Sequence, residues 1–125
     1  MYDIRINSLG TVYLSHAPEN ANKIVRIAED MAQNGWKGRP AIMLDAGDHK
    51  IALNATHRLC AAIGQDIEID TVMLPDDLTA DEWDSIERAN DDDDLLAALE
   101  EINESRDGEI DEIVAVMREE VAQNK

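Results

Sequence analysis

The residues best suited to chemistry lie where a predicted strand turns directly into a predicted helix, at the run Asn54, Ala55, Thr56, His57 and Arg58. The first turn of a helix leaves backbone N–H groups without helical partners and carries the positive end of the helix dipole, so it favours an anion. Cations in that turn oppose the dipole and cost stability. A histidine and an arginine placed there therefore predict a site for a phosphate or a carboxylate.

Each of these side chains also has a structural interpretation. Thr56 is a residue type that caps helices without any further function. Arg58 could instead pair with a carboxylate across the preceding turn, such as Asp45 or Asp48, and His57 could serve as a structural hydrogen-bonding residue. The sequence leaves these alternatives open.

The elements around this run mix strands and helices up to about residue 75. Alternation and short apolar runs predict strands, whereas apolar residues at helical spacing predict helices. The expected strands cover residues 2–6, 11–14, 41–44, 50–53 and 67–73, and the expected helices cover about 20–34 and 56–63. Gly35 and Gly64 are the expected helix ends, and residues 45–49 are the expected hairpin turn.

Beyond Pro75 the pattern is helical and strongly acidic. Residues 76–125 hold 19 acidic and 4 basic residues, a net charge of −15, whereas residues 1–75 carry only −2. Thr79 and Glu82 match a capping box, and the aspartates at 91–94 precede a second apolar-periodic stretch, whose helix they could cap or to which they could form a solvated linker. We therefore expect an α/β (α+β) domain over residues 1–75 and an acidic helical subdomain over 76–125.

Composition limits the functional classes. No run approaches the roughly 20 apolar residues of a membrane span, and no signal-peptide pattern follows Met1, so we expect a cytoplasmic protein without membrane partners. The single Cys60 excludes an internal disulfide and a cysteine zinc site, and the three histidines lack metal-ligand spacing, so no metal site is predicted. The acidic charge and the 3% aromatic content disfavour direct DNA binding.

The order of elements resembles the ParB/sulfiredoxin-like superfamily over about residues 15–74. The matching features are a helix ending in Gly35-Trp36, a strand led by Pro40, and a His57-Arg58 pair at a helix start that is followed by small residues. Small ParB-like proteins of phages and mobile elements are the most similar members. The resemblance implies a small mixed sheet with helices.

The resemblance also implies a nucleotide-phosphate cradle at the helix start. Asn54, Thr56, His57 and Arg58 would be its contacts, a nucleotide with Mg²⁺ would be the ligand, and phosphoryl transfer or hydrolysis would be the reaction. Glu19 lies where related kinases keep a catalytic acid, although a glutamate in a first helical turn also complements the helix dipole. His16 is a further residue that could face the pocket.

Two departures from the family bear on function. Sulfiredoxin has its reactive cysteine immediately before the histidine, where this chain has Thr56, and this excludes the sulfiredoxin reaction. The family's glycine is Ala55 here, and its Cβ restricts both positive φ and close ligand approach. An open cradle would favour nucleotide binding, whereas a cradle filled by Ala55 would favour a role without a ligand.

The alternative function belongs to a different class. The chain could be a non-enzymatic acidic interaction protein, a phage-type inhibitor or DNA mimic whose partner is a basic nucleic-acid-binding protein. A purely structural interpretation is that the acidic helices fold onto their own core and leave their charges exposed to water. The apolar stripe from Ile110 to Val121 could also form a homodimer through the C-terminal helix.

Overall fold

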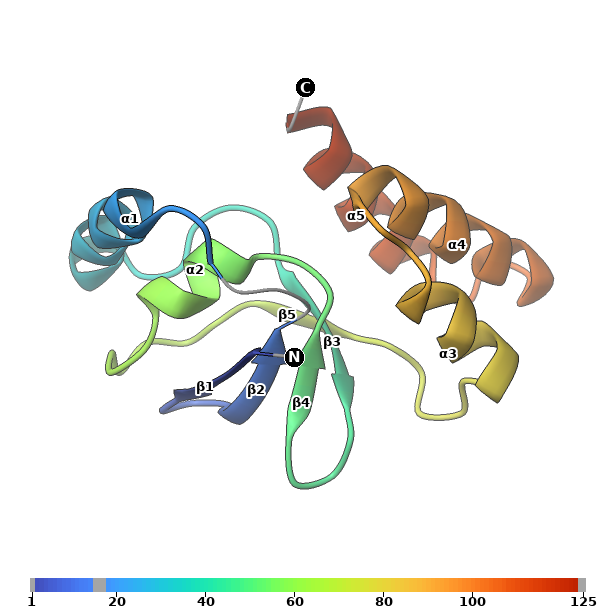
Figure 1. Ribbon diagram of the computed structural model, residues 1–125, viewed down its shortest axis with the longest axis horizontal. Coiled ribbons are helices and arrows are strands. Elements are labelled where there is room, and N and C mark those ends of the chain that lie inside the picture. The colour runs from blue at the N-terminus through green and yellow to red at the C-terminus, as the bar shows by residue number, and fades with distance from the viewer. Residues whose placement is uncertain (1, 15–17, 124–125) are drawn as a thin grey trace. The chain divides into compact units, whose positions relative to one another are not determined.

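The computed structural model describes residues 2–14 and 18–123 (Figure 1). Over these residues it contains one mixed five-stranded sheet and five α-helices, which confirms the predicted α/β class. The chain divides into two compact units, Met1–Met73 and Leu74–Lys125. We call them the sheet unit and the helical unit and describe each by itself.

The sheet unit has its strands in the order β1-β2-β4-β3-β5. β1 (Tyr2–Ile6) and β2 (Gly10–Leu14) form an antiparallel hairpin, and β3 (Ala41–Asp45) and β4 (Lys50–Ala52) form a second one. Two parallel pairings complete the sheet, β2 with β4 and β3 with β5 (Thr71–Met73). The hairpin turn predicted at residues 45–49 is confirmed.

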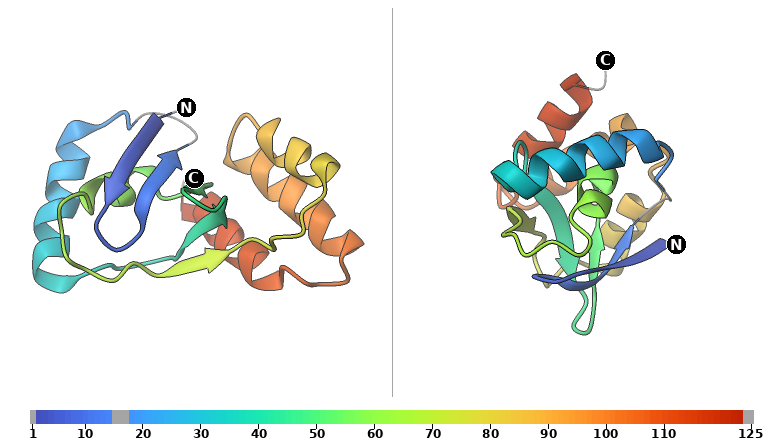
Figure 2. Two further views of the ribbon diagram at one scale, coloured as in Figure 1. Left: turned by 90° about the horizontal axis from the view of Figure 1, so that it is seen from below. Right: turned by 90° about the vertical axis from the view of Figure 1, so that its left-hand side faces the viewer.

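Two helices pack against each other on one side of this sheet, as Figures 1 and 2 show. α1 (Ala21–Asn34) begins after Asn20, whose side chain accepts from the N–H of Lys23 at 3.0 Å. It ends at Gly35, which has φ +74, a value that glycine adopts without a steric penalty. α2 (Thr56–Ala61) follows β4 after a short turn. Both helix starts agree with the prediction.

The core of the sheet unit consists of small and medium aliphatic side chains between the sheet and these helices. From the strands it takes Ile4, Ile6, Val12, Leu14, Ala41, Met43 and Ala52, and from the helices and the turn after α2 it takes Met31, Leu59, Cys60, Ala61 and Ala62. Cys60 is buried, and burial raises the pKa of its thiol. It is a core residue, as expected from an apolar helix.

Two predicted boundaries of the sheet unit are wrong. α2 ends at Ala61 rather than at Ile63. The strand expected over residues 67–73 covers only Thr71–Met73, because pairing with β3 begins opposite Ala41. Ile67 and Ile69 still pack half-buried against the core. The alternating pattern therefore indicated which residues are buried, but these residues do not pair with another strand.

The helical unit contains α3 (Ala80–Glu87), α4 (Asp92–Ser105) and α5 (Asp111–Gln123), with α4 packed against both neighbours. The capping box of Thr79 and Glu82 is confirmed, and the carboxylate of Asp91 caps α4 by accepting from Asp94 N–H at 2.8 Å. No helix in the described part of the chain is long and apolar enough to cross a membrane.

The apolar residues of α5 are buried within the single chain. They are Ile113, Val114, Val116, Met117 and Val121. α4 packs against α5 within the helical unit, and a homodimer through the C-terminal helix stays a prediction.

A cluster around Arg106 connects the elements of the helical unit. Nε and Nη2 of Arg106 donate to the two carboxylate oxygens of Glu82 at 2.7 and 2.6 Å. Nη1 donates to Asp77 at 3.0 Å and to Glu109 at 2.9 Å. Glu82 also accepts from the Thr79 N–H at 2.9 Å. Hydrogen bonds from Arg106, followed by that from Thr79, lower the pKa of Glu82 to about 2.

Candidate functional site

The turn into α2 has an unusual backbone at Ala55. This residue occupies the N-cap position with φ +65 and ψ +30, the left-handed region that alanine rarely adopts. The position where the family resemblance expects glycine is therefore one where the backbone favours glycine. Ala55 has no side-chain oxygen to cap the helix, and no acidic residue lies in the first turn. The expectation that Thr56 is the N-cap is wrong, because Thr56 is the first helical residue.

Asn54 fixes the position of this turn against β3. Its buried side chain accepts from the N–H of Ile42 at 2.7 Å and donates to the carbonyl of Pro40 at 3.3 Å. A buried amide that satisfies two backbone groups of a neighbouring strand specifies one arrangement of the two segments. The structure thus gives Asn54 a positioning role at the predicted anion site.

Arg58 binds the loop that connects α1 to β3. Its Nη1 atom donates to the carbonyls of Lys37, at 3.3 Å, and Arg39, and its guanidinium lies 4.7 Å from the ring centroid of Trp36. Gly38 has φ +89, a conformation that favours glycine, and a Cβ there would lie in van der Waals contact with Nη1 at 3.4 Å. Arg58 therefore holds residues 36–39 beside the first turn of α2.

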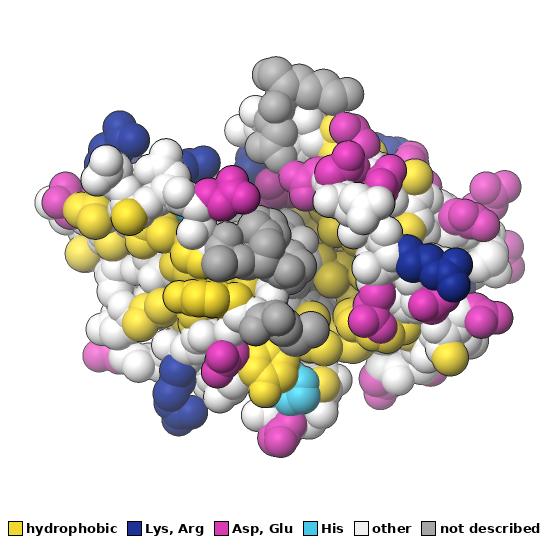
Figure 3. All heavy atoms as spheres, viewed as in Figure 1, with side chains coloured by type: hydrophobic (Ala, Val, Ile, Leu, Met, Phe, Trp, Pro, Cys, Tyr) yellow, Lys and Arg dark blue, Asp and Glu magenta, His cyan; other side chains and the backbone are white. Residues whose placement is uncertain are grey.

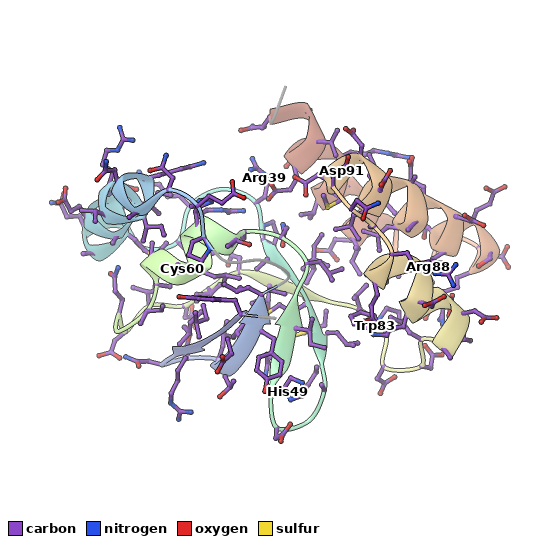
Figure 4. The ribbon with its side chains drawn as sticks, viewed as in Figure 1. Arg39, His49, Cys60, Trp83, Arg88 and Asp91 are labelled. Atoms are coloured by element: carbon purple, nitrogen blue, oxygen red, sulfur yellow. The ribbon has the colours of Figure 1, made fainter. Side chains whose placement is uncertain are left out.

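The alternative ion pair of Arg58 across the hairpin turn is wrong. Asp45 accepts from the Gly47 N–H, and Asp48 accepts from His49 at 2.7 Å, which lowers the pKa of Asp48. The ring of His49 also lies 4.5 Å from the ring of Tyr13. Figure 4 shows His49 at the β3–β4 hairpin, where these contacts give it a structural role.

The contact between Arg58 and the backbone carbonyls of the loop links two segments that hold four basic residues on a nearly neutral unit, and the Lys37 ammonium donates to Asp30 of α1 at 3.2 Å. Lys37 and Arg39 come from the loop, and His57 and Arg58 come from the first turn of α2. We call these four residues the cationic turn. Sequence reasoning missed Lys37 and Arg39, although two cations within the five-residue loop starting at Trp36 were a usable signal. Arg39 is labelled in Figure 4 on that loop.

The remaining predicted residues are placed as follows. Thr56 is buried and His57 is half-buried in the first turn of α2. Glu19 is exposed and precedes the Asn20 cap, so it lies outside the first turn of α1, contrary to the dipole interpretation. His16 lies outside the described residues. Among the residues that the structure describes, no group of three or more His, Cys, Asp or Glu side chains is arranged to hold a metal ion.

The helical unit carries a dense carboxylate surface, which Figure 3 shows on the part of the unit in view. Some of these carboxylates stabilise helix starts, since Asp81 and Glu82 open α3 and Asp111 and Glu112 open α5. Others pair with arginines, as Asp84 does with Arg88 at 2.8 Å. Both groups have a structural explanation.

Three further glutamates have none. Glu101 and Glu104 are exposed near the C-terminus of α4, and Glu119 is exposed near the C-terminus of α5. No basic residue lies in the last turn of either helix. Negative charge in the last turn of a helix costs about 0.3–1 kcal/mol, and this applies to Glu104, whereas Glu101 and Glu119 lie one residue before the last turn of their helices.

Comparisons of the chain with protein-family models, with curated proteins and with solved structures found no match.

Proposed function

We propose that the sheet unit binds a phosphate-bearing small molecule, with a nucleotide as first choice, at the cationic turn. The observation that carries the proposal is the attachment of a basic loop to the helix start, because Arg58 in the first turn of α2 donates to the backbone carbonyls of Lys37 and Arg39. The helix dipole and guanidinium groups both favour phosphate. Ala55 in the left-handed region supports the same cradle geometry that the ParB/sulfiredoxin-like resemblance implies.

Catalysis is a further step of the same proposal. Phosphoryl transfer or hydrolysis is implied by the resemblance, with Glu19 as the candidate acid or base. Mg²⁺ would arrive with the nucleotide, since this ion is commonly held by substrate phosphates and one or two carboxylates. Binding is the part that the residues support most directly.

Calorimetric titration with ATP, CTP and GTP, each with and without Mg²⁺, tests binding. Arg58→Ala is expected to weaken the affinity about tenfold to a hundredfold, since a charge-assisted hydrogen bond contributes about 1.5–3 kcal/mol. Because Arg58 also holds the loop, circular dichroism must show that the variant is folded. Arg26→Ala, which removes an exposed cation of α1, is the matched control and should bind like the wild type. A wild type that binds none of these nucleotides at millimolar concentration would refute the proposal.

A second candidate function is favoured by three exposed glutamates of the helical unit, Glu101, Glu104 and Glu119, which have no capping or ion-pairing role among the described residues. Glu104 opposes the dipole of α4, and Glu101 and Glu119 are exposed carboxylates on α4 and α5, so this acidic surface would suit a basic nucleic-acid-binding protein that the unit binds as a DNA mimic. An exposed surface with a net charge of −15 over residues 76–125 would accelerate such an association in a salt-sensitive way.

Affinity capture from a host lysate at 0.1 and 0.5 M salt tests this second candidate. The expected partners are DNA-binding proteins that salt or added duplex DNA releases. The triple variant Glu101→Gln, Glu104→Gln, Glu119→Gln should capture less of these partners. The control variant Glu29→Gln, Glu68→Gln, Asp70→Asn makes the same charge change at exposed positions of the sheet unit and should capture as much as the wild type. If the amount of captured partner changes neither with salt nor with the triple substitution, the DNA-mimic function is contradicted.

A further inference from the structure

β1 is an edge strand whose sequence is complementary to itself. Within the described residues it pairs only with β2, and it lies at the margin of the sheet in Figures 1 and 2. Its five residues alternate, with Ile4 and Ile6 buried toward the core and Asp3 and Arg5 exposed on the opposite face. An unpaired edge offers backbone N–H and C=O groups to another strand.

We propose that β1 pairs antiparallel with β1 of a second copy of this chain, in a register centred on Ile4. This inference is independent of the proposed ligand site. In this register each Asp3 lies opposite the Arg5 of the other copy. Two opposite-charge cross-strand pairs form, related by the two-fold axis that joins identical strands.

The charges select this register over its neighbours. A register must shift by two residues to keep the apolar face of both strands on the core side. The nearest such shifts place Asp3 opposite Asp3 or Arg5 opposite Arg5, and like charges directly opposite each other are unfavourable. Only the pairing centred on Ile4 keeps the apolar residues of both strands on the core side and also places opposite charges across from each other on the exposed side.

The exposed tyrosine of β1 supports the same register. Tyr2 alternates with Ile4 and Ile6, yet it is 43% exposed because it lies at the end of the strand. In the proposed pairing Tyr2 lies opposite Ile6 of the other copy, and aromatic residues paired with β-branched ones stabilise antiparallel strands. The other edge strand, β5 (Thr71–Met73), has three residues and no charged residue.

The interaction is expected to be weak, because a five-residue strand pair buries less surface than the roughly 1,200 Å² of a stable interface. Sedimentation velocity at 0.15 M salt, from about 10 μM to 1 mM, should show a monomer–dimer equilibrium. Arg5→Asp alone and Asp3→Arg alone should each weaken dimerisation roughly tenfold to a hundredfold, since each turns two attractive pairs into repulsive ones.

The decisive measurement is the charge exchange. The double variant Asp3→Arg/Arg5→Asp should dimerise like the wild type, and an equimolar mixture of the two single variants should form a heterodimer that neither forms alone. Neither position faces a charged residue across the β1–β2 hairpin, because Asp3 pairs with Tyr13 and Arg5 with Thr11, so the fold should tolerate the exchange. Circular dichroism checks this. The proposal would be overturned if the wild type stays monomeric at 1 mM, or if the single substitutions leave the dimerisation affinity unchanged.

Discussion

Replacing Glu82 with glutamine tests whether the ion pairs around Arg106 stabilise the helical unit. Glutamine retains the carbonyl oxygen that accepts from Thr79 N–H, because capping boxes use glutamate or glutamine at this position. The substitution therefore removes the negative charge opposite Arg106 while it preserves the helix cap. The change isolates the charge-assisted contacts at 2.6 and 2.7 Å.

The expected magnitude follows from the pKa of Glu82. A fall from about 4.5 to about 2 corresponds to at most about 3 kcal/mol of stabilisation at neutral pH. Solvent screening reduces this value, because the pair is near the surface, so we expect Glu82→Gln to lower the free energy of unfolding by about 1–2 kcal/mol at pH 7. Since the folded pKa is depressed, this stabilisation is present above about pH 5 and is lost as the pH falls toward 2.

Urea unfolding followed by circular dichroism at pH 7, 5.5, 4.5 and 3.5 measures the effect. The difference between wild type and Glu82→Gln should shrink to roughly half or less by pH 3.5, because the carboxyl group is protonated in the unfolded chain. Glu87→Gln is the control, since Glu87 is exposed on the same helix and has no ion pair among the described residues. If Glu82→Gln behaves like this control at pH 7, or if its effect is independent of pH, the cluster does not stabilise the unit as described.

Three further predictions concern the sheet unit. Asn54→Ala should lower the free energy of unfolding by about 1–3 kcal/mol in urea titrations, because the buried Ile42 N–H loses its acceptor; an unchanged value would show that water replaces the amide. Ala55→Gly should raise it by up to about 1 kcal/mol by relieving the left-handed strain, and a lower stability would contradict that strain. Cys60 should react with a thiol reagent about a hundredfold more slowly in the folded protein than in 6 M guanidinium, whereas equal rates would mean that it is accessible.

The features predicted correctly from the sequence are those that depend on nearby residues. Gly35 ends α1, Asp91 caps α4, and Thr79 pairs with Glu82 three residues away, so the signal and its effect lie in the same short segment. The strand expected from residue 67 fails for the opposite reason. Its start depends on where β3 offers a partner, and that information lies thirty residues upstream at Ala41.

The candidate site shows the same division. The strand-to-helix turn and the cations in the first turn of α2 could be predicted from neighbouring residues. The partners of Arg58, in contrast, come from a loop about twenty residues earlier. Asn54 was predicted as a ligand contact, and its bonds to Pro40 and Ile42 arise only once β3 lies alongside. Arg106 was not singled out at all, because its acidic partners come from three separate segments.

The two units also imply different folding rates. The sheet unit is complete only when β5, its last strand, pairs with β3, and both of its parallel pairings join strands separated by a helix. In the helical unit each packed helix pair is consecutive in the chain. Because non-local pairing slows folding, refolding should show a fast phase from the helices and a slower phase from the sheet. A newly made chain would therefore expose the outer edge of β3 until β5 pairs with it, although β3 is synthesised before the whole helical unit.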